Sequence, residues 1–275
     1  MNDTLYVSDL DRTLLNSDIE VSKRSEEIIN DLISKGMKFT IATARSWYSA
    51  YGKVECLDLE LPVSTYNGSY IVDPVSGEVI ESKGFEENER EKILDSFLEK
   101  DIFPLVYSFI EGEEKVSWIG EKENVGLRKY LDYRKRDDRL RKIEYNDRLY
   151  DGEPFYFTAI DKKEKLERLL PFFDEQGYLS YHFQKDLNTD DHYWLEVKHR
   201  EADKALSVER IKEMTGCSRV VSFGDNVNDI PMFSVSDEGY AVSNANEELK
   251  GLATGIIPTS DEDGVSEWLL RNICF

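Results

Sequence analysis

The sequence predicts an α/β fold, a doubly wound and mainly parallel sheet with an inserted α+β domain. Short apolar runs alternate with amphipathic helices at both ends of the chain, and polar residues follow these runs directly. The middle of the chain has a different character. The whole chain has 275 residues, which correspond to roughly one and a half to two typical domains. We expect a core domain formed by 1–82 and 191–275, with the inserted domain at 83–190.

The N-terminal part predicts strands joined by a helix. Residues 5–7 form a short apolar run, and a helix then begins near Ser22, a residue type that caps helix N-termini. The helix ends near Gly36, where a glycine cap is typical. Apolar runs at 37–42 and 61–66 predict two further strands. Strands separated by a helical crossover favour a parallel sheet.

The middle of the chain predicts a mixed α+β arrangement. In order, we expect a helix at 86–100, strands at 103–109 and 115–119, a helix at 123–135, a strand at 155–160, a helix at 162–176 and a strand at 178–184. A polar stretch at 186–191 is typical of a linker. The first pattern then returns, with a helix at 204–214 and a strand at 220–223.

The composition excludes several classes of partner. With 35 Lys and Arg against 56 Asp and Glu, the net charge is −21, so the surface repels phosphate backbones and we expect no nucleic-acid partner. A site for a phosphorylated metabolite must therefore carry its own cation or a metal ion. Cys56, Cys217 and Cys274 are widely spaced, which favours a reducing compartment. Without a signal peptide or a membrane-spanning run, we expect a cytoplasmic protein without a membrane partner. The sequence does not predict the oligomeric state.

Polar side chains follow three of the predicted strands. These residues are Asp9 and Asp11, then Thr43, then Asp225 with Asn228 and Asp229. Because ligands bind outside the carboxyl ends of parallel strands, the three segments are expected to converge on one place. Four carboxylates there would repel each other unless a cation lies among them. Oxygen ligands without nearby His or Cys indicate a hard ion, Mg²⁺ in the first place.

The spacing of Asp9 and Asp11 suits covalent carboxylate chemistry. A turn can bring both carboxyl groups to one reacting centre, where one serves as nucleophile and the other as general acid. Alternatively, the two residues only cap a strand-to-helix turn; the polar cluster at another strand end favours the chemical interpretation. A calcium loop of the EF-hand type is excluded, because Leu14 occupies the position that requires glycine.

Four motifs in chain order resemble the haloacid dehalogenase-like (HAD) superfamily, in the form of its Cof-type phosphatases. They lie at 9–14, 41–45, 203–206 and 224–229, and further landmarks are Asn67-Gly68, Asn244-Ala245 and Asp263-Gly264-Val265. The resemblance implies a Rossmann-like HAD core, and it implies that the inserted domain is the larger cap of that subfamily. The cap would then select the substrate.

The resemblance further implies a Mg²⁺-dependent phosphomonoesterase for small phosphorylated metabolites, sugar phosphates in the first place. Asp9 would attack phosphorus and form an aspartyl-phosphate, while Asp11 would act as general acid and then as general base. Thr43, Lys204, Asn228 and the backbone at Leu10 and Ala44 would bind the phosphoryl oxygens. Asp9, the Asp11 carbonyl and Asp225 would bind Mg²⁺, with Asp229 orienting that shell.

Several alternatives remain open. A sucrose- or mannosylglycerate-phosphate type of phosphatase is the nearest, a phosphomutase is a further one, and a non-catalytic sugar-phosphate sensor belongs to another class. A dehalogenase would leave the carboxylate cluster unexplained.

The chain also departs from the family pattern, since Arg12, Ala44 and Ala205 stand where glycines are usual. Arg12 either makes an ion pair with an acidic residue, or faces the site entrance and attracts anions.

Overall fold

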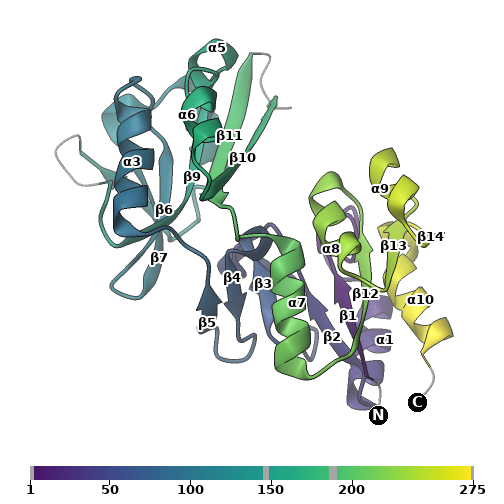
Figure 1. The fold of residues 1–275 in the computed structure, drawn as a ribbon. Helices are drawn as coiled ribbons and strands as arrows, with labels where there is room; N and C mark the ends of the chain where they lie inside the picture. Colours follow the sequence, from purple (N-terminus) through teal and green to yellow (C-terminus); the bar gives the residue numbers. More distant parts are fainter. Residues whose placement is uncertain (1–2, 145–148, 186–190, 274–275) are drawn as a thin grey trace. The chain divides into compact units, whose positions relative to one another are not determined.

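The computed structural model describes residues 3–144, 149–185 and 191–273 (Figure 1). The chain divides into two compact units. The core unit comprises Met1–Ser82 and Ala202–Phe275, and the inserted unit comprises Lys83–Glu201. The second boundary predicted from the sequence, at 190, is therefore too early. Strand β11 (His192–His199) pairs with strands of the inserted unit and belongs to it. The predicted linker lies, except for Asp191, outside the described residues, as does Cys274.

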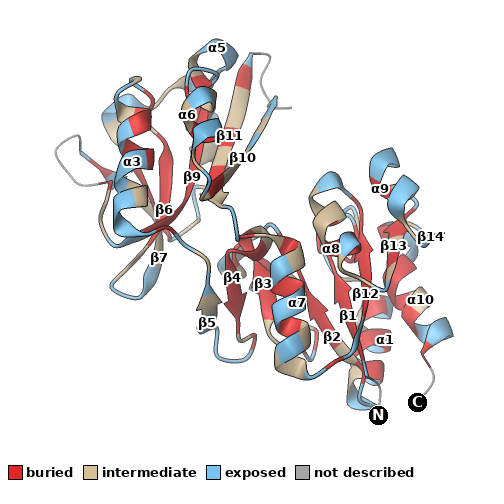
Figure 2. Cartoon of the chain, in the orientation of Figure 1, coloured by how far each residue is buried: buried red, intermediate tan, exposed pale blue. Residues whose placement is uncertain are grey.

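The core unit is built on a parallel five-stranded sheet. Its strands are β1 (Thr4–Ser8), β2 (Lys38–Ile41), β12 (Arg219–Gly224), β13 (Glu238–Val242) and β14 (Gly255–Ile257), in the order β14-β13-β12-β1-β2. Each neighbouring pair is parallel. All five residues of β1 are buried, as expected for a strand covered on both faces (Figure 2). The predicted parallel α/β core is confirmed.

Helices cover this sheet. They are α1 (Lys23–Ser34), α2 (Trp47–Val54), α7 (Lys204–Thr215), α8 (Ile230–Ser234), α9 (Glu247–Leu252) and α10 (Gly264–Asn272). Helix α1 begins as predicted, because the Ser22 side chain accepts a hydrogen bond from the Ser25 backbone. It buries Ile28, Ile29 and Leu32, and Gly36 follows it with a positive φ of 98°. Helix α1 packs against α10, and α7 packs against α8.

The third predicted strand joins a different sheet. Strand β3 (Val63–Thr65) pairs antiparallel with β4 (Tyr70–Val72), and β4 pairs antiparallel with β5 (Val79–Ser82). A single parallel bridge between Ala42 and Ser64 connects this small sheet to the end of β2. The short 3-10 turn η1 (Tyr66–Gly68) reverses the chain between β3 and β4, so that β3 pairs with the strand that follows it.

The inserted unit contains a six-stranded sheet in the order β10-β11-β9-β6-β7-β8. Its strands are β6 (Leu105–Ile110), β7 (Glu113–Ile119), β8 (Leu140–Ile143), β9 (Glu153–Lys162), β10 (Leu179–Lys185) and β11. All neighbours are antiparallel except β7 and β8. The helices are α3 (Glu87–Leu98), α4 (Val125–Tyr133), α5 (Lys163–Leu166) and α6 (Leu170–Glu175). The sequence predicted one helix at 162–176, but two short helices, α5 and α6, occupy this range. Pro171 lies in the first turn of α6, where a proline is tolerated.

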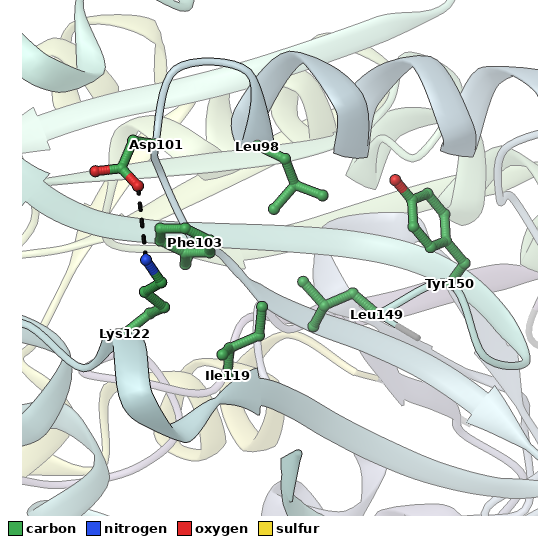
Figure 3. A pocket seen from close by; sticks show the side chains of 7 residues that line it. All are labelled: Leu98, Asp101, Phe103, Ile119, Lys122, Leu149 and Tyr150. Atoms are coloured by element: carbon green, nitrogen blue, oxygen red, sulfur yellow. Dashed lines mark ion pairs between the residues drawn. The ribbon is translucent and has the colours of Figure 1, made fainter. Parts of the chain in front are cut away.

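The inserted unit has its own aromatic core, which includes Phe97, Phe157 and Phe173. A hollow of about 250 Å³ lies beside it, and Leu98, Ile119 and Leu149 contribute to its lining (Figure 3). Asp101 and Lys122 form an ion pair of 3.9 Å at this hollow. None of the residues lining it was predicted to carry chemistry.

No helix in the described parts of the chain is long and apolar enough to cross a bilayer.

Candidate active site

The site lies where the strand order of the core sheet reverses. From β1 the chain continues to β2 on one side, whereas β12 to β14 follow one another on the other side. Ser8 of β1 is in register with Phe223 of β12, so Asp9 and Asp225 emerge from neighbouring strand ends. Thr43 follows the end of β2, the other neighbour of β1. Such a reversal point at the carboxyl edge is the usual ligand site of an open α/β sheet.

Three buried carboxylates meet at this point. Asp9, Asp225 and Asp229 each offer an oxygen, and these oxygens lie within 4.8 Å of one another. The Lys204 ammonium group donates to the Asp9 Oδ1 atom at 2.6 Å and to the Asp229 Oδ1 atom at 2.7 Å. Only 1% of the Lys204 side chain is exposed. One ammonium group therefore faces three carboxylates, and the cluster as a whole can hold a metal ion.

Asp229 is fixed by its own loop. It ends the 3-10 turn η3 (Val227–Asp229), and its Oδ2 atom accepts hydrogen bonds from the backbone of Asp225 at 3.0 Å and of Asn226 at 3.1 Å. Gly224 makes this approach possible, since a β-carbon there would lie 2.8 Å from the Asp229 carboxylate. The second oxygen of Asp229 remains directed to Lys204.

Burial and mutual repulsion change the acidity of the cluster. Burial, and then the charge of Asp229, raise the pKa of Asp225 to about 6, although Arg12 and Lys204 act in the opposite direction. Burial also raises the pKa of Asp9, with Lys204 opposing it and Asp229 adding to it. For Lys204, burial disfavours the charged form, but Asp229 and Asp9 outweigh burial and raise its pKa. The cluster thus lacks positive charge, which a bound cation would supply.

The fourth expected carboxylate, that of Asp11, lies near enough for its charge to act on Asp225 but has a cationic partner of its own. Asp11 was predicted to join the other three, but its side chain is 46% exposed and paired with Arg45. The Arg45 Nε atom donates to Asp11 Oδ2 at 2.8 Å, and its Nη2 atom donates to Oδ1 at 2.6 Å. This two-pronged contact with a guanidinium group satisfies both carboxylate oxygens. The sequence predicted no role for Arg45; its position two residues after Thr43 was the available signal.

The remaining predicted residues surround the cluster at the same edge. Thr43 is fully buried, and its hydroxyl oxygen accepts a hydrogen bond from the Arg45 backbone at 3.1 Å. Ala44 is exposed and is not among the described residues with positive φ. Leu10 is buried, and its carbonyl accepts hydrogen bonds from the backbone of 13–15. Asn228 donates from Nδ2 to the Asn67 Oδ1 atom at 3.2 Å.

The turn at Tyr66–Gly68 joins several of these segments. Tyr66, Asn67 and Gly68 all adopt positive φ, at 50°, 52° and 97°. The Asn67 backbone donates to the Thr43 carbonyl at 2.9 Å, and the Tyr66 backbone donates to the Arg45 carbonyl at 2.9 Å. The sequence predicted no role for Asn67 beyond its match to a landmark of the family. The structure places it against both the Thr43 loop and Asn228.

Arg12 stands beside the cluster. Its φ is 60°, in the left-handed region. Asn244 holds it from both sides: the Asn244 Nδ2 atom donates to the Arg12 carbonyl at 2.9 Å, and the Arg12 Nη2 atom donates to the Asn244 carbonyl at 3.3 Å. The guanidinium Nε atom lies 3.9 Å from Asp225 Oδ2. Arg12 thus makes an ion pair with a carboxylate of the site itself.

The family model of haloacid dehalogenase-like hydrolases matches residues 6–269. The chain belongs to this family. The match confirms two predictions: that the chain is a member of the HAD superfamily and that it is a hydrolase. The four motifs on which the prediction rested lie within the matched residues.

Relatives of this HAD-like chain cover it almost completely. A 5-amino-6-(5-phospho-D-ribitylamino)uracil phosphatase of Bacillus subtilis is 26% identical over 95% of each chain. A second B. subtilis phosphatase is 23% identical over 96% of this chain and 98% of its own.

Among solved structures, a haloacid dehalogenase-like hydrolase of Bacteroides thetaiotaomicron is 25% identical, covers 98% of this chain and 99% of its own, and has a TM-score of 0.78. A Thermotoga maritima protein is 24% identical over 100% of this chain and 98% of its own, with a TM-score of 0.79. The fold, including the inserted sheet, is thus shared.

Proposed function

We propose that this HAD-like hydrolase is a Mg²⁺-dependent phosphatase of small phosphorylated metabolites, sugar phosphates among them, and that it works through an aspartyl-phosphate at Asp9. The observation that carries the proposal is the buried group of Asp9, Asp225 and Asp229 around Lys204. Phosphoryl transfer requires mainly positioning and neutralisation of charge. The relatives named as phosphatases support the activity, and the name of the first includes a phosphorylated ribityl compound.

The donor set fits a hard divalent cation. All of its side-chain ligands are carboxylate oxygens. The pKa values of Asp9 and Asp225 are raised first by burial and then by neighbouring carboxylates, and a cation would favour the ionised forms. We assign Mg²⁺ to Asp9, Asp225 and the Asp11 carbonyl, with Asp229 orienting these ligands. When bound, the ion would polarise the phosphoryl oxygens and neutralise charge that develops on them.

The chain's own residues then supply the remaining chemistry. The Asp9 carboxylate attacks phosphorus, so that the bond to the leaving oxygen breaks and an acyl phosphate forms on Asp9. Asp11 gives its proton to the leaving oxygen and afterwards takes one from the water that hydrolyses the acyl phosphate. The phosphoryl oxygens are bound by Lys204, Asn228, Thr43 and the backbone N–H groups at Leu10 and Ala44.

Two contacts must exchange for this sequence to occur. Lys204 is bonded to Asp9 and Asp229, and an incoming phosphoryl group would replace part of this carboxylate environment. Asp11 must exchange its pairing with Arg45 for the leaving oxygen. Arg45 is therefore a candidate for holding Asp11 between turnovers.

We further propose that the inserted unit serves as the cap that selects the substrate. The supporting observation is that the buried carboxylates and Lys204 all belong to the core unit, whereas the inserted unit is a separate compact body.

A trapping experiment tests the proposed function. Purified protein is mixed with a phosphate ester labelled on phosphorus, quenched in acid and examined for acyl phosphate, with Mg²⁺ and with excess chelator. We expect labelled protein and steady release of phosphate only with Mg²⁺. Asp9→Asn should give neither, and Asp31→Asn, at an exposed pair with Lys35 on α1, is the matched control. Tight binding of phosphate esters without any turnover would instead favour the sensor alternative.

A further inference from the structure

Three cationic side chains lie at the site, and two of them are committed to carboxylates. Lys204 donates hydrogen bonds to the carboxylates of Asp9 and Asp229 at 2.6 and 2.7 Å. Arg45 donates to both carboxylate oxygens of Asp11. Arg12 differs, since its contact with Asp225 is 3.9 Å long and 69% of its side chain is exposed. Its guanidinium makes one hydrogen bond within the described residues, to the Asn244 carbonyl. Most of its donors are therefore available to a ligand.

The backbone at Arg12 adopts a conformation that a glycine would adopt more easily. A φ of 60° places its β-carbon close to the following carbonyl, which is unfavourable for any residue with a side chain. Strain of this kind persists where the surrounding structure enforces it, and it concentrates at ligand sites. Asn244 supplies that enforcement, because its side chain holds the Arg12 carbonyl while its own carbonyl accepts from the guanidinium. The pair fixes a long cationic side chain beside Asp225.

We infer that Arg12 is a specificity-determining residue that binds a second oxyanion of the substrate, a carboxylate or a second phosphate, beside the phosphoryl group that is hydrolysed. The inference rests on the proposed phosphatase function and narrows its substrate class to compact esters with two anionic groups. A guanidinium group binds a carboxylate or a phosphate in a bidentate manner, through two parallel hydrogen bonds. In a chain of net charge −21, such a substrate needs a cation beyond those that receive the reacting phosphoryl group.

The contact with Asp225 does not explain Arg12 by itself. With 69% of the Arg12 side chain exposed and a separation of 3.9 Å, this ion pair adds little to stability even though Asp225 is buried. A cation held by Asp225 would also compete with Arg12 for the same carboxylate. The guanidinium group would then face the ligand, and its hydrogen bond to the Asn244 carbonyl would be its remaining contact in the described part of the chain.

Matched pairs of esters test the inference on the intact enzyme. One pair is 2-phosphoglycolate and 2-hydroxyethyl phosphate, which differ by a carboxylate in place of a hydroxymethyl group. The other is propane-1,3-diol bisphosphate and 3-hydroxypropyl phosphate, which differ by the second phosphate. For each pair, we measure the ratio of kcat/KM between the ester with two anionic groups and the ester with one. The variants are Arg12→Gly, Arg12→Asn and Arg12→Lys, where Gly and Asn both tolerate the left-handed backbone.

We expect the ratio to fall roughly 10- to 100-fold in Arg12→Gly and Arg12→Asn, the range for a lost charge-assisted hydrogen bond. The change should appear mainly in KM, and Arg12→Lys should retain part of the ratio. A fall with only one of the two pairs identifies the oxyanion as carboxylate or as phosphate. Arg24→Ala, which removes an exposed arginine of α1 that pairs with Glu267 of α10, should leave both ratios unchanged.

Two results would overturn the inference: an equal loss for both members of each pair, or no loss at all. A loss that disappears completely at high salt would also overturn it, because a direct contact is screened far less than long-range attraction. If the wild type hydrolyses none of the four esters, the proposed function is decided by the trapping experiment with a labelled phosphate ester. The inference is then judged by the same ratios of dissociation constants, measured by calorimetry with Mg²⁺. An unchanged binding ratio in Arg12→Asn would refute it.

Discussion

A β-carbon added to Gly68 would lie 2.2 Å from the carbonyl oxygen of Asp203. Asp203 is the N-cap of α7, whose first residue is Lys204. The turn that carries Asn67 therefore rests directly on the backbone that places the buried ammonium group. The absence of a side chain at position 68 is thus a requirement of the site as well as of the turn.

We expect Gly68→Ala to destabilise the protein and to lower its activity, because α7 must shift and carry Lys204 with it. Gly36→Ala is the matched control, since Gly36 has a φ of 98° against 97° for Gly68, but nothing lies within 4 Å of its added β-carbon. The control should cost about 1 kcal/mol in the free energy of unfolding, from the backbone conformation alone. Gly68→Ala should cost about 1–3 kcal/mol more. Urea unfolding and the hydrolysis of an aryl phosphate measure both effects, and equal costs would contradict the proposed link to α7.

Replacement of the proposed nucleophile should abolish turnover without loss of the fold. Asp9→Asn removes the attacking oxygen but keeps a hydrogen-bond acceptor for Lys204, which also retains Asp229. It also removes one of three mutually repelling carboxylates, so the melting temperature in the absence of metal should not fall. Residual activity above a few per cent of the wild type would rule out the covalent role, and Asp31→Asn, prepared in parallel, should retain wild-type activity.

Lys204 is expected to stabilise the protein most strongly when no metal is bound. Lys204→Met leaves buried carboxylates without their cation, and breaking a buried pair in this way costs about 3–5 kcal/mol. Mg²⁺ should restore part of this loss, because it supplies positive charge to the same group. The free energies of unfolding with and without Mg²⁺ measure the effect, and Lys23→Met, at an exposed pair with Glu26, is the control. A variant as stable as the wild type in excess chelator would contradict the expectation.

The stabilisation by Mg²⁺ should increase with pH. The pKa of Asp225 is raised to about 6 from its ordinary 3.8, so the folded, metal-free protein binds more protons than the unfolded chain between these values. Its free energy of unfolding should therefore fall as the pH rises from about 4 to about 6. Mg²⁺ requires the ionised carboxylates, so its contribution should grow over the same interval.

Melting temperatures at about pH 5, 6 and 7, with and without Mg²⁺, test this expectation. Asp225→Asn removes the titrating group and one proposed ligand, and should lose most of the pH-dependent gain. A Mg²⁺ effect that is constant or decreasing over this range would contradict the assigned ligands.

Much of the site was predictable because it depends on strand order. Asp9 and Asp225 follow apolar runs, and parallel pairing brings such strand ends together without further information. The burial of Lys204 and the pairing of Asp11 with Arg45 depend on side-chain orientations that no local pattern contains.

The errors in the fold have local causes. Strand β11 was missed because the domain boundary was placed at the preceding polar stretch. Strand β3 was assigned to the parallel sheet although Asn67-Gly68 is a typical hairpin signal.

The order β14-β13-β12-β1-β2 also has a consequence during synthesis of the chain. Strand β1 is synthesised well before its neighbour β12, which begins only at Arg219. The inserted unit is continuous, from Lys83 to Glu201, so it can be completed while β1 still has an unpaired edge. At roughly 5–20 residues per second, the roughly 210 residues between these two strands take roughly 10–40 s to make. We therefore expect the nascent N-terminal segment, with an unpaired edge of β1, to depend on chaperones during that interval.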